Sequence, residues 1–170
     1  MPEKHENPCH ACAVNRECCT LKGACGLMLT NAEYERHFRR HEADLTIRQT
    51  NGFYIISSRE GRVCPHLDNN GCRIYRDRPI DCRLYPYIIR RFIRRGNRVK
   101  VAFHSKSGCP EKKMLIHSMS AATAKSLAVD FGKEVFGDGT KVVAQMERGL
   151  ISRLCLRLEA AIARLSHGKR

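Results

Sequence analysis

The fold of this chain depends on residues 64–86, CPHLDNNGCRIYRDRPIDCRLYP. The cysteines of this stretch are Cys64, Cys72 and Cys82. Asn69-Asn70-Gly71 is a turn signal between the first two, and Pro79 restricts the backbone before the third. Because the spacing is wide, we expect the fold as a whole, and not one short loop, to gather these sulfurs around a bound metal.

Ten cysteines occur in the chain, and its first residues lack the apolar run of a signal peptide. No stretch reaches the roughly 18 apolar residues of a membrane span. We therefore expect a cytoplasmic protein. Since cytosolic thiols are kept reduced, close cysteine spacing then indicates metal ligation or redox chemistry and not disulfides.

A second group of cysteines lies near the N-terminus, in the pattern Cys9-x2-Cys12-x5-Cys18-Cys19. Two cysteines three residues apart in a turn can place both sulfurs on one metal. The side chains of an adjacent pair diverge, so Cys18 and Cys19 serve different centres or only one of them is a ligand. The predicted metal ligands are Cys9, Cys12, Cys18, Cys19, Cys64, Cys72, Cys82 and Cys109.

Four further cysteine and histidine side chains are candidate metal ligands but are assigned other roles. Cys25, beside Gly26, is predicted to be a small buried residue, and Cys155 is predicted to belong to the apolar core. His10 and His66 each adjoin a predicted ligand. Since thiolates are already sufficient, we expect both imidazoles to support the site or to be exposed.

Thiolates alone do not choose the metal, because they suit both zinc and a [4Fe–4S] cluster, in one centre or two. Structural zinc binds small peptides with roughly 10–16 kcal/mol. That range is comparable to the ~5–15 kcal/mol by which whole domains are stable. We therefore expect that the chain cannot fold without its metal.

The stretch 64–86 resembles a known pattern. Three runs carry the resemblance: Cys64-Pro65-x-Leu67, Gly71-x-Arg73-Ile74-Tyr75 around Cys72, and Arg78-Pro79-x2-Cys82-Arg83 followed by Pro86. They are similar to the second half of the CxxCxxCC cysteine-cluster family, which is also called the YkgJ-type zinc- or iron-chelating domain. Leu29-Thr30 with Glu33 resembles the family's L-T-x-x-E helix start, and Cys109-Pro110 its late C-P. The resemblance covers about residues 9–110.

The resemblance implies zinc or iron–sulfur chelation, and more weakly the methyl transfer of the related flagellin lysine-N-methylases. The family name indicates two residues between the second cysteine and the CC pair, whereas five stand here. Which of Cys18, Cys19 and Cys25 are ligands is therefore left open. We expect Arg78 and Arg83, which belong to the matched motif, to stabilise the bound cofactor, because a [4Fe–4S]²⁺ cluster with four thiolates carries net negative charge.

The remaining sequence predicts an α+β fold: a small metal-organised domain with a short antiparallel hairpin, cysteine-rich loops and C-terminal helices. A capping box at Thr30 and Glu33 predicts a helix to about residue 43, and residues 52–58 read as a strand. Residues 87–94 and 98–104 predict the hairpin. Helices are expected at 111–136 and from 140 onward, where apolar residues recur at spacings of three and four: Val143, Met146, Leu150, Leu154, Leu158, Ile162 and Leu165. We divide the chain into a cysteine-cluster domain, 1–110, and a helical hairpin packed on it, 111–170.

The formal net charge of +14 indicates an anionic partner. An acidic protein surface or large assembly is the first candidate and RNA the second; the basic residues concentrate in residues 83–100. Sequence signatures of an RNA-recognition module are absent, so RNA would be held through phosphates.

Three functions fit these observations. The first is a metal-binding accessory or interaction module, favoured because the sequence shows no GxSxG, P-loop or HExxH motif. The second is an iron–sulfur-dependent enzyme that modifies proteins. The third is a basic adaptor for RNA or an assembly, with structural metal. Whether the chain is an enzyme is left open, and no catalytic residue is predicted.

Overall fold

The computed structural model describes residue 21 and residues 26–50, 52–59, 62–69, 71–105 and 119–147. The predictions for Cys9, Cys12, Cys18, Cys19, Cys25, Cys109 and Cys155 lie outside the described residues, as do those for His10 and for the apolar stripe beyond residue 147. Within the described part of the chain, no helix is long and apolar enough to cross a membrane.

The first sheet is antiparallel, with strand order β1-β3-β2. It consists of β1 (Leu27–Thr30), β2 (Leu45–Thr50) and β3 (Phe53–Ser58). The strand predicted at 52–58 is confirmed as β3, whereas β1 and β2 were not predicted. Helix α1 (Asn31–His37) leads from β1, and a 3₁₀ segment, η2 (Arg39–Asp44), completes the connection to β2.

The predicted capping box at the start of α1 is confirmed. The Thr30 hydroxyl accepts a hydrogen bond from the Glu33 N–H at 3.3 Å, and the Glu33 carboxylate accepts one from the Thr30 N–H at 2.9 Å. The helical conformation changes to 3₁₀ after Phe38, so the helix predicted to about residue 43 is present as two shorter pieces.

Small elements fill the cysteine-rich middle of the chain. They are the two-residue strands β4 (Leu67–Asp68) and β5 (Gly71–Cys72), the 3₁₀ turn η3 (Tyr75–Asp77) and helix α2 (Ile80–Leu84). Leu67 pairs with Cys72, and the chain turns directly afterwards.

The second large sheet has the order β6-β7-β8. The hairpin of β6 (Tyr87–Arg95) and β7 (Arg98–Ser105) is confirmed. Helix α4 (Ala121–Phe136) carries the chain from β7 to β8 (Lys141–Met146), which runs parallel to β7. A helix between parallel neighbours is the usual crossover connection.

The helix expected from residue 140 is wrong over 141–146. Val143 and Met146 fit helical spacing, but the same six residues also alternate, with Val142 and Ala144 turned to α4. Pairing with β7 decides between these alternatives, and β-branched residues suit a strand. Strand β8 also joins residues on both sides of position 110 into one sheet. The α+β class itself is confirmed, since strands and helices contribute to the same small fold.

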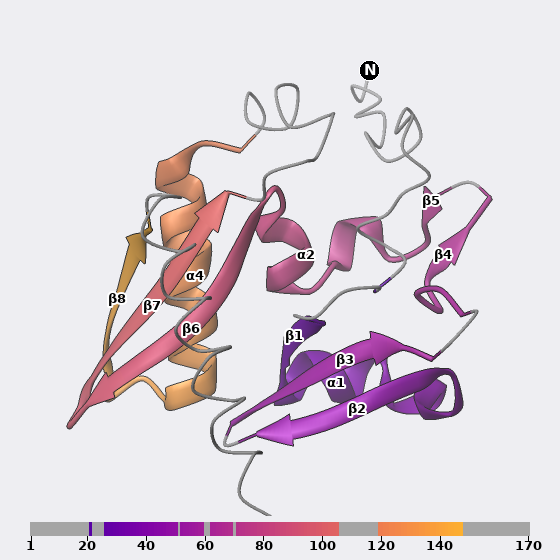
Figure 1. Cartoon of the computed structure of the whole chain (residues 1–170), viewed down its shortest axis with the longest axis horizontal. Helices are drawn as coiled ribbons and strands as arrows, with labels where there is room; N and C mark the ends of the chain where they lie inside the picture. Colours follow the sequence, from indigo (N-terminus) through magenta and orange to yellow (C-terminus); the bar gives the residue numbers. More distant parts are fainter. Residues whose placement is uncertain are drawn as a thin grey trace, which may run out of the picture.

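The core consists of two apolar clusters, and α2 contacts elements of both. Figure 1 shows α2 between α4 and β1. The larger cluster joins α4 to the β6-β7-β8 sheet and includes Val101, Phe103, Leu127 and Phe131. The smaller one joins α1 to the first sheet and includes Leu29, Phe38 and Ile56. Helix α2 contributes Ile80 and Leu84 to the larger cluster, and Cys82 packs against the smaller one.

Gly132 tests how closely α4 packs on the sheet. A Cβ atom there would come within 2.6 Å of Val142 Cγ1 and 3.0 Å of Val101 Cγ2. We expect Gly132→Leu to lower the free energy of unfolding by about 1–3 kcal/mol, the usual cost of overpacking. Gly139→Ala is the control, because a Cβ at Gly139 meets nothing within 4 Å. Equal urea midpoints for the two variants would contradict this packing.

Candidate metal centre

Three cysteine thiols lie in the same region, where α2 approaches the β4–β5 hairpin. Cys64 precedes β4, Cys72 lies in β5 and Cys82 in α2; all three are partly buried and none is in a disulfide. Each lies close enough to the others that charge on Cys72 raises the pKa of Cys64, and charge on Cys64 and Cys72 raises that of Cys82. In Figure 1, α2 and the β4–β5 hairpin both lie in the upper half of the view, with the hairpin to the right of the helix.

Cys64 occupies a turn whose backbone faces its sulfur. Burial raises the pKa of the Cys64 thiol to about 11, although hydrogen bonds from the backbone N–H groups of His66 and Leu67 act in the opposite direction. The turn is closed by a 2.9 Å hydrogen bond from the Leu67 N–H to the Cys64 carbonyl. N–H groups directed at sulfur stabilise a metal-bound thiolate.

Cys82 has the more strongly desolvated thiol. Burial and the neighbouring charges of Asp81 and Cys64 raise its pKa well above the usual value, and the Arg78 guanidinium lowers it. Arg78 lies over the Tyr75 ring, with Cζ 3.7 Å from the ring centroid. Its Nε–H is buried and has no acceptor among the described residues. Arg78 therefore offers positive charge and a donor beside this thiol, whereas Arg83 is exposed on α2.

The donor set fits a thiophilic cation. Thiols with raised pKa values stay protonated in an apolar setting, and a bound cation supplies the charge that allows thiolates to form there. Within residues 21–147 as described, no three His, Cys, Asp or Glu side chains converge closely enough to hold an ion by themselves. The predicted set includes further cysteines, at positions 9, 12, 18, 19 and 109, which lie outside the described ranges.

Comparison with known families agrees with this chemistry. Residues 8–110 match a family model described as "CxxCxxCC: Putative zinc- or iron-chelating domain". The chain belongs to the CxxCxxCC family. Its metal-chelating character follows from that membership and from the grouped thiols. No curated protein and no solved structure matched the chain.

In this CxxCxxCC domain, the Glu33 carboxylate fixes the start of α2. The helix begins after Pro79, which provides no side-chain cap, so the Ile80 N–H needs an acceptor from elsewhere. Glu33 Oε1 accepts that hydrogen bond, while its Oε2 accepts the one from the Thr30 N–H. Burial raises the pKa of Glu33, and these two backbone donors lower it. One carboxylate thus joins the N-termini of α1 and α2.

Asp81 makes the reciprocal connection. Its Oδ2 accepts a 3.0 Å hydrogen bond from the Met28 N–H in β1. Burial raises the pKa of Asp81 to about 7; the Met28 N–H lowers it and the charge on Glu33 raises it. Its Oδ1 has no hydrogen-bond partner among the described residues. Together Glu33 and Asp81 hold α2, and therefore Cys82, against β1 and α1; we call this pair the carboxylate clamp.

His66 anchors the Cys64 turn in a similar way. Its side chain is buried, and its Nε2 lies 2.8 Å from the His37 carbonyl oxygen, where it acts as the donor. Its ring meets Phe38 edge-on at 5.0 Å between centroids. The remaining face of the turn is held by Arg73, which donates to the Pro65 carbonyl. His66 therefore supports the turn, in line with the expectation from sequence.

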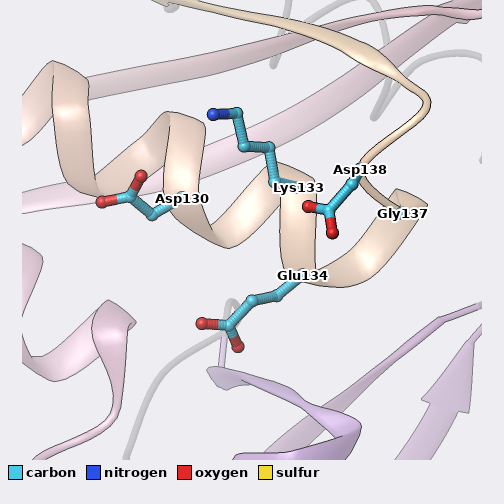
Figure 2. Close-up of a pocket in the computed structure, with 5 residues that line it drawn as sticks. All are labelled: Asp130, Lys133, Glu134, Gly137 and Asp138. Atoms are coloured by element: carbon cyan, nitrogen blue, oxygen red, sulfur yellow. The ribbon is translucent and has the colours of Figure 1, made fainter.

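A shallow depression at the other end of the molecule has different chemistry. It is lined by Asp130, Lys133, Glu134, Gly137 and Asp138, at the C-terminal end of α4. Figure 2 shows Asp130, Lys133 and Glu134 projecting in different directions from the helix. It carries no cysteine and is not part of the candidate metal centre.

Sequence reasoning missed the clamp. Glu33 was predicted only as the partner of Thr30, and Asp81 and its bond to Met28 were not predicted. The one available signal was the L-T-x-x-E resemblance, which marked Glu33 without indicating what else it binds. The roles of Arg78, Arg83 and the eight cysteines as cofactor ligands or supports stay predictions.

The clamp makes a direct prediction. Glu33→Ala would leave the Thr30 and Ile80 N–H groups without acceptors, at a cost of roughly 1–3 kcal/mol each. We expect a lower urea midpoint together with a lower metal content per chain, because Cys82 moves with α2. Glu33→Gln keeps one carbonyl acceptor, so its urea midpoint and its metal content should lie between those of Glu33→Ala and wild type.

Glu35→Ala is the matched control. Glu35 is exposed and forms an i,i+4 ion pair with Arg39 at 2.6 Å. Such exposed pairs contribute little to stability, because solvent screens their charges. If Glu33→Ala retained as much stability and metal as Glu35→Ala, the clamp would have no role in holding α2.

Proposed function

We propose that this CxxCxxCC protein is a metal-binding accessory module, in which the centre organises the surface that the protein presents to a partner. The observation that carries this proposal is the grouping of three partly buried thiols from three separate segments around α2. The proposed ligands are Cys64, Cys72 and Cys82 with cysteines from positions 9, 12, 18, 19 and 109.

Desolvation of the thiols supports a structural role over nucleophilic catalysis. A cysteine nucleophile works as a thiolate, and its pKa is lowered in reactive sites. Here burial raises the pKa values of Cys64 and Cys82. A bound cation, by contrast, stabilises thiolates and cross-links the segments that supply them. The β4–β5 hairpin is two residue pairs long, so such a cross-link would be its main constraint.

Arg78 favours iron–sulfur over zinc within this proposal. A [4Fe–4S]²⁺ cluster with four thiolates keeps net negative charge, and cations or N–H donors nearby stabilise it. Arg78 supplies both, with an Nε–H that lacks an acceptor among the described residues. The alternative of an iron–sulfur-dependent protein-modifying enzyme shares this centre and differs in requiring an accessible position on it.

Metal analysis tests the proposal. Protein prepared without oxygen is expected to contain metal near stoichiometry and to lose its cooperative thermal transition when a chelator is added. Cys72→Ser should reproduce that loss, because Cys72 is held in β5 opposite Leu67 and its thiol is one of the three proposed ligands that the structure describes. Absorbance near 400 nm that bleaches on reduction would identify iron–sulfur, and a colourless zinc protein would exclude it.

Cys155→Ser is the control, since Cys155 is predicted to be a core thiol and not a ligand. It should keep wild-type metal content and melting. Metal-free protein that melts at the same temperature as the metal-loaded protein would overturn the proposal.

A further inference from the structure

The face of the β6-β7-β8 sheet that is turned away from α4 carries a row of exposed cations. Val99, Val101 and Phe103 of β7 pack towards α4, so the intervening residues of that strand face the other side. In the register, Arg95 of β6 is opposite Arg98 of β7, and Arg98 is opposite Lys141 of β8. We call Arg95, Arg98 and Lys141 the basic row.

This arrangement costs stability in the isolated protein. Neighbouring strands lie ~4.8 Å apart, and like charges directly opposite one another repel. All three side chains are exposed, and none forms an ion pair with another described residue. The nearest acidic residue in sequence is Asp138, in the turn before β8. The row therefore lacks internal compensation among the described side chains.

The next positions on this face extend the positive charge. Lys100 lies one row further along, between Ile93 and Val143, and its side chain is exposed. Its Nζ donates a 2.9 Å hydrogen bond to Gln145 Oε1, which is a neutral partner. The following row is neutral overall, because Arg91 pairs with Glu147 at 2.6 Å. Positive charge thus gathers at the end of the sheet where the β6–β7 hairpin turns.

The residue types favour phosphate over a protein partner. A protein interface needs a buried apolar or aromatic centre, whereas a phosphate backbone needs only cations and N–H donors. On this face, the basic row and the next two rows contain no aromatic side chain, and their only large apolar side chains are Ile93 and Val143, which flank Lys100. Bases would therefore find no stacking surface there, and recognition would be independent of sequence.

We propose that the basic row, with Lys100, is a docking surface for the phosphate backbone of a nucleic acid. This inference goes beyond the metal-binding role and does not depend on which metal is bound. Each neutralised phosphate releases counterions, so binding should weaken steeply as salt is raised.

The test uses the metal-loaded full chain and measures fluorescence anisotropy of a short labelled RNA duplex, and of a DNA duplex of the same sequence, across a salt series. Both duplexes should bind with similar affinity. Arg95→Gln, Arg98→Gln and Lys141→Gln together should weaken binding about tenfold or more and reduce the slope of log K against log salt by about 2–3.

A second triple variant removes the same charge elsewhere. Arg40, Arg48 and Lys125 are exposed residues of η2, β2 and α4, and their replacement by glutamine should leave the affinity within about threefold of wild type if location matters more than net charge. The basic-row variant should melt no lower than wild type, because it relieves repulsion. Arg95→Lys with Arg98→Lys should retain the salt slope, since both charges remain.

Several results would overturn the proposal. If both triple variants lost the same affinity for the duplex, net charge and not the position of the basic row would account for binding. Binding to only one of the duplexes would mean that more than phosphate is read. Competition by polyglutamate as effective as that by unlabelled duplex would assign the surface to an acidic protein.

Discussion

A helix of five residues cannot satisfy its own backbone, and α2 shows how this constraint shapes the site. Its first N–H groups need acceptors from other segments, and its Pro79 start removes the usual side-chain cap. Glu33 of α1 provides the acceptor, and Asp81 accepts a hydrogen bond from the Met28 N–H of β1. Because Cys82 lies in the same turn, the position of a predicted metal ligand follows from the hydrogen-bonding needs of a short helix.

Burial of the two clamp carboxylates is a balance of opposing effects. Desolvation raises the pKa values of Glu33 and Asp81, and a like charge adds to each: Glu134 raises the pKa of Glu33, and Glu33 raises that of Asp81. Backbone N–H groups compensate part of that cost. The same pattern recurs at Cys64, where desolvation is opposed by N–H groups of the following turn. Charged or chargeable groups are thus held in apolar surroundings by main-chain donors, as expected for a site completed by a cation.

The two sheets contribute differently to function. The first sheet and α1 provide the rigid side on which α2 and the Cys64 turn are held, through Glu33, Met28 and the His37 carbonyl. The second sheet with α4 forms the larger apolar cluster and carries exposed basic residues on the face turned away from the helix. Metal binding and polyanion docking, as proposed, would therefore use opposite sides of α2 without sharing residues.

The amino-acid sequence alone determined the features that depend on near neighbours: the cysteine-rich motif and its family, the capping box at Thr30 and Glu33, and the alternating hairpin of β6 and β7. Each is written within a few residues, because capping and strand alternation are local. Only the tertiary structure decided that 141–146 is a strand, that Glu33 also binds α2, and that Arg95, Arg98 and Lys141 form one row. The physical reason is that these outcomes depend on partners 40 or more residues away, such as β7 for β8 and Ile80 for Glu33. A short stretch of sequence does not contain the residue with which it will pair.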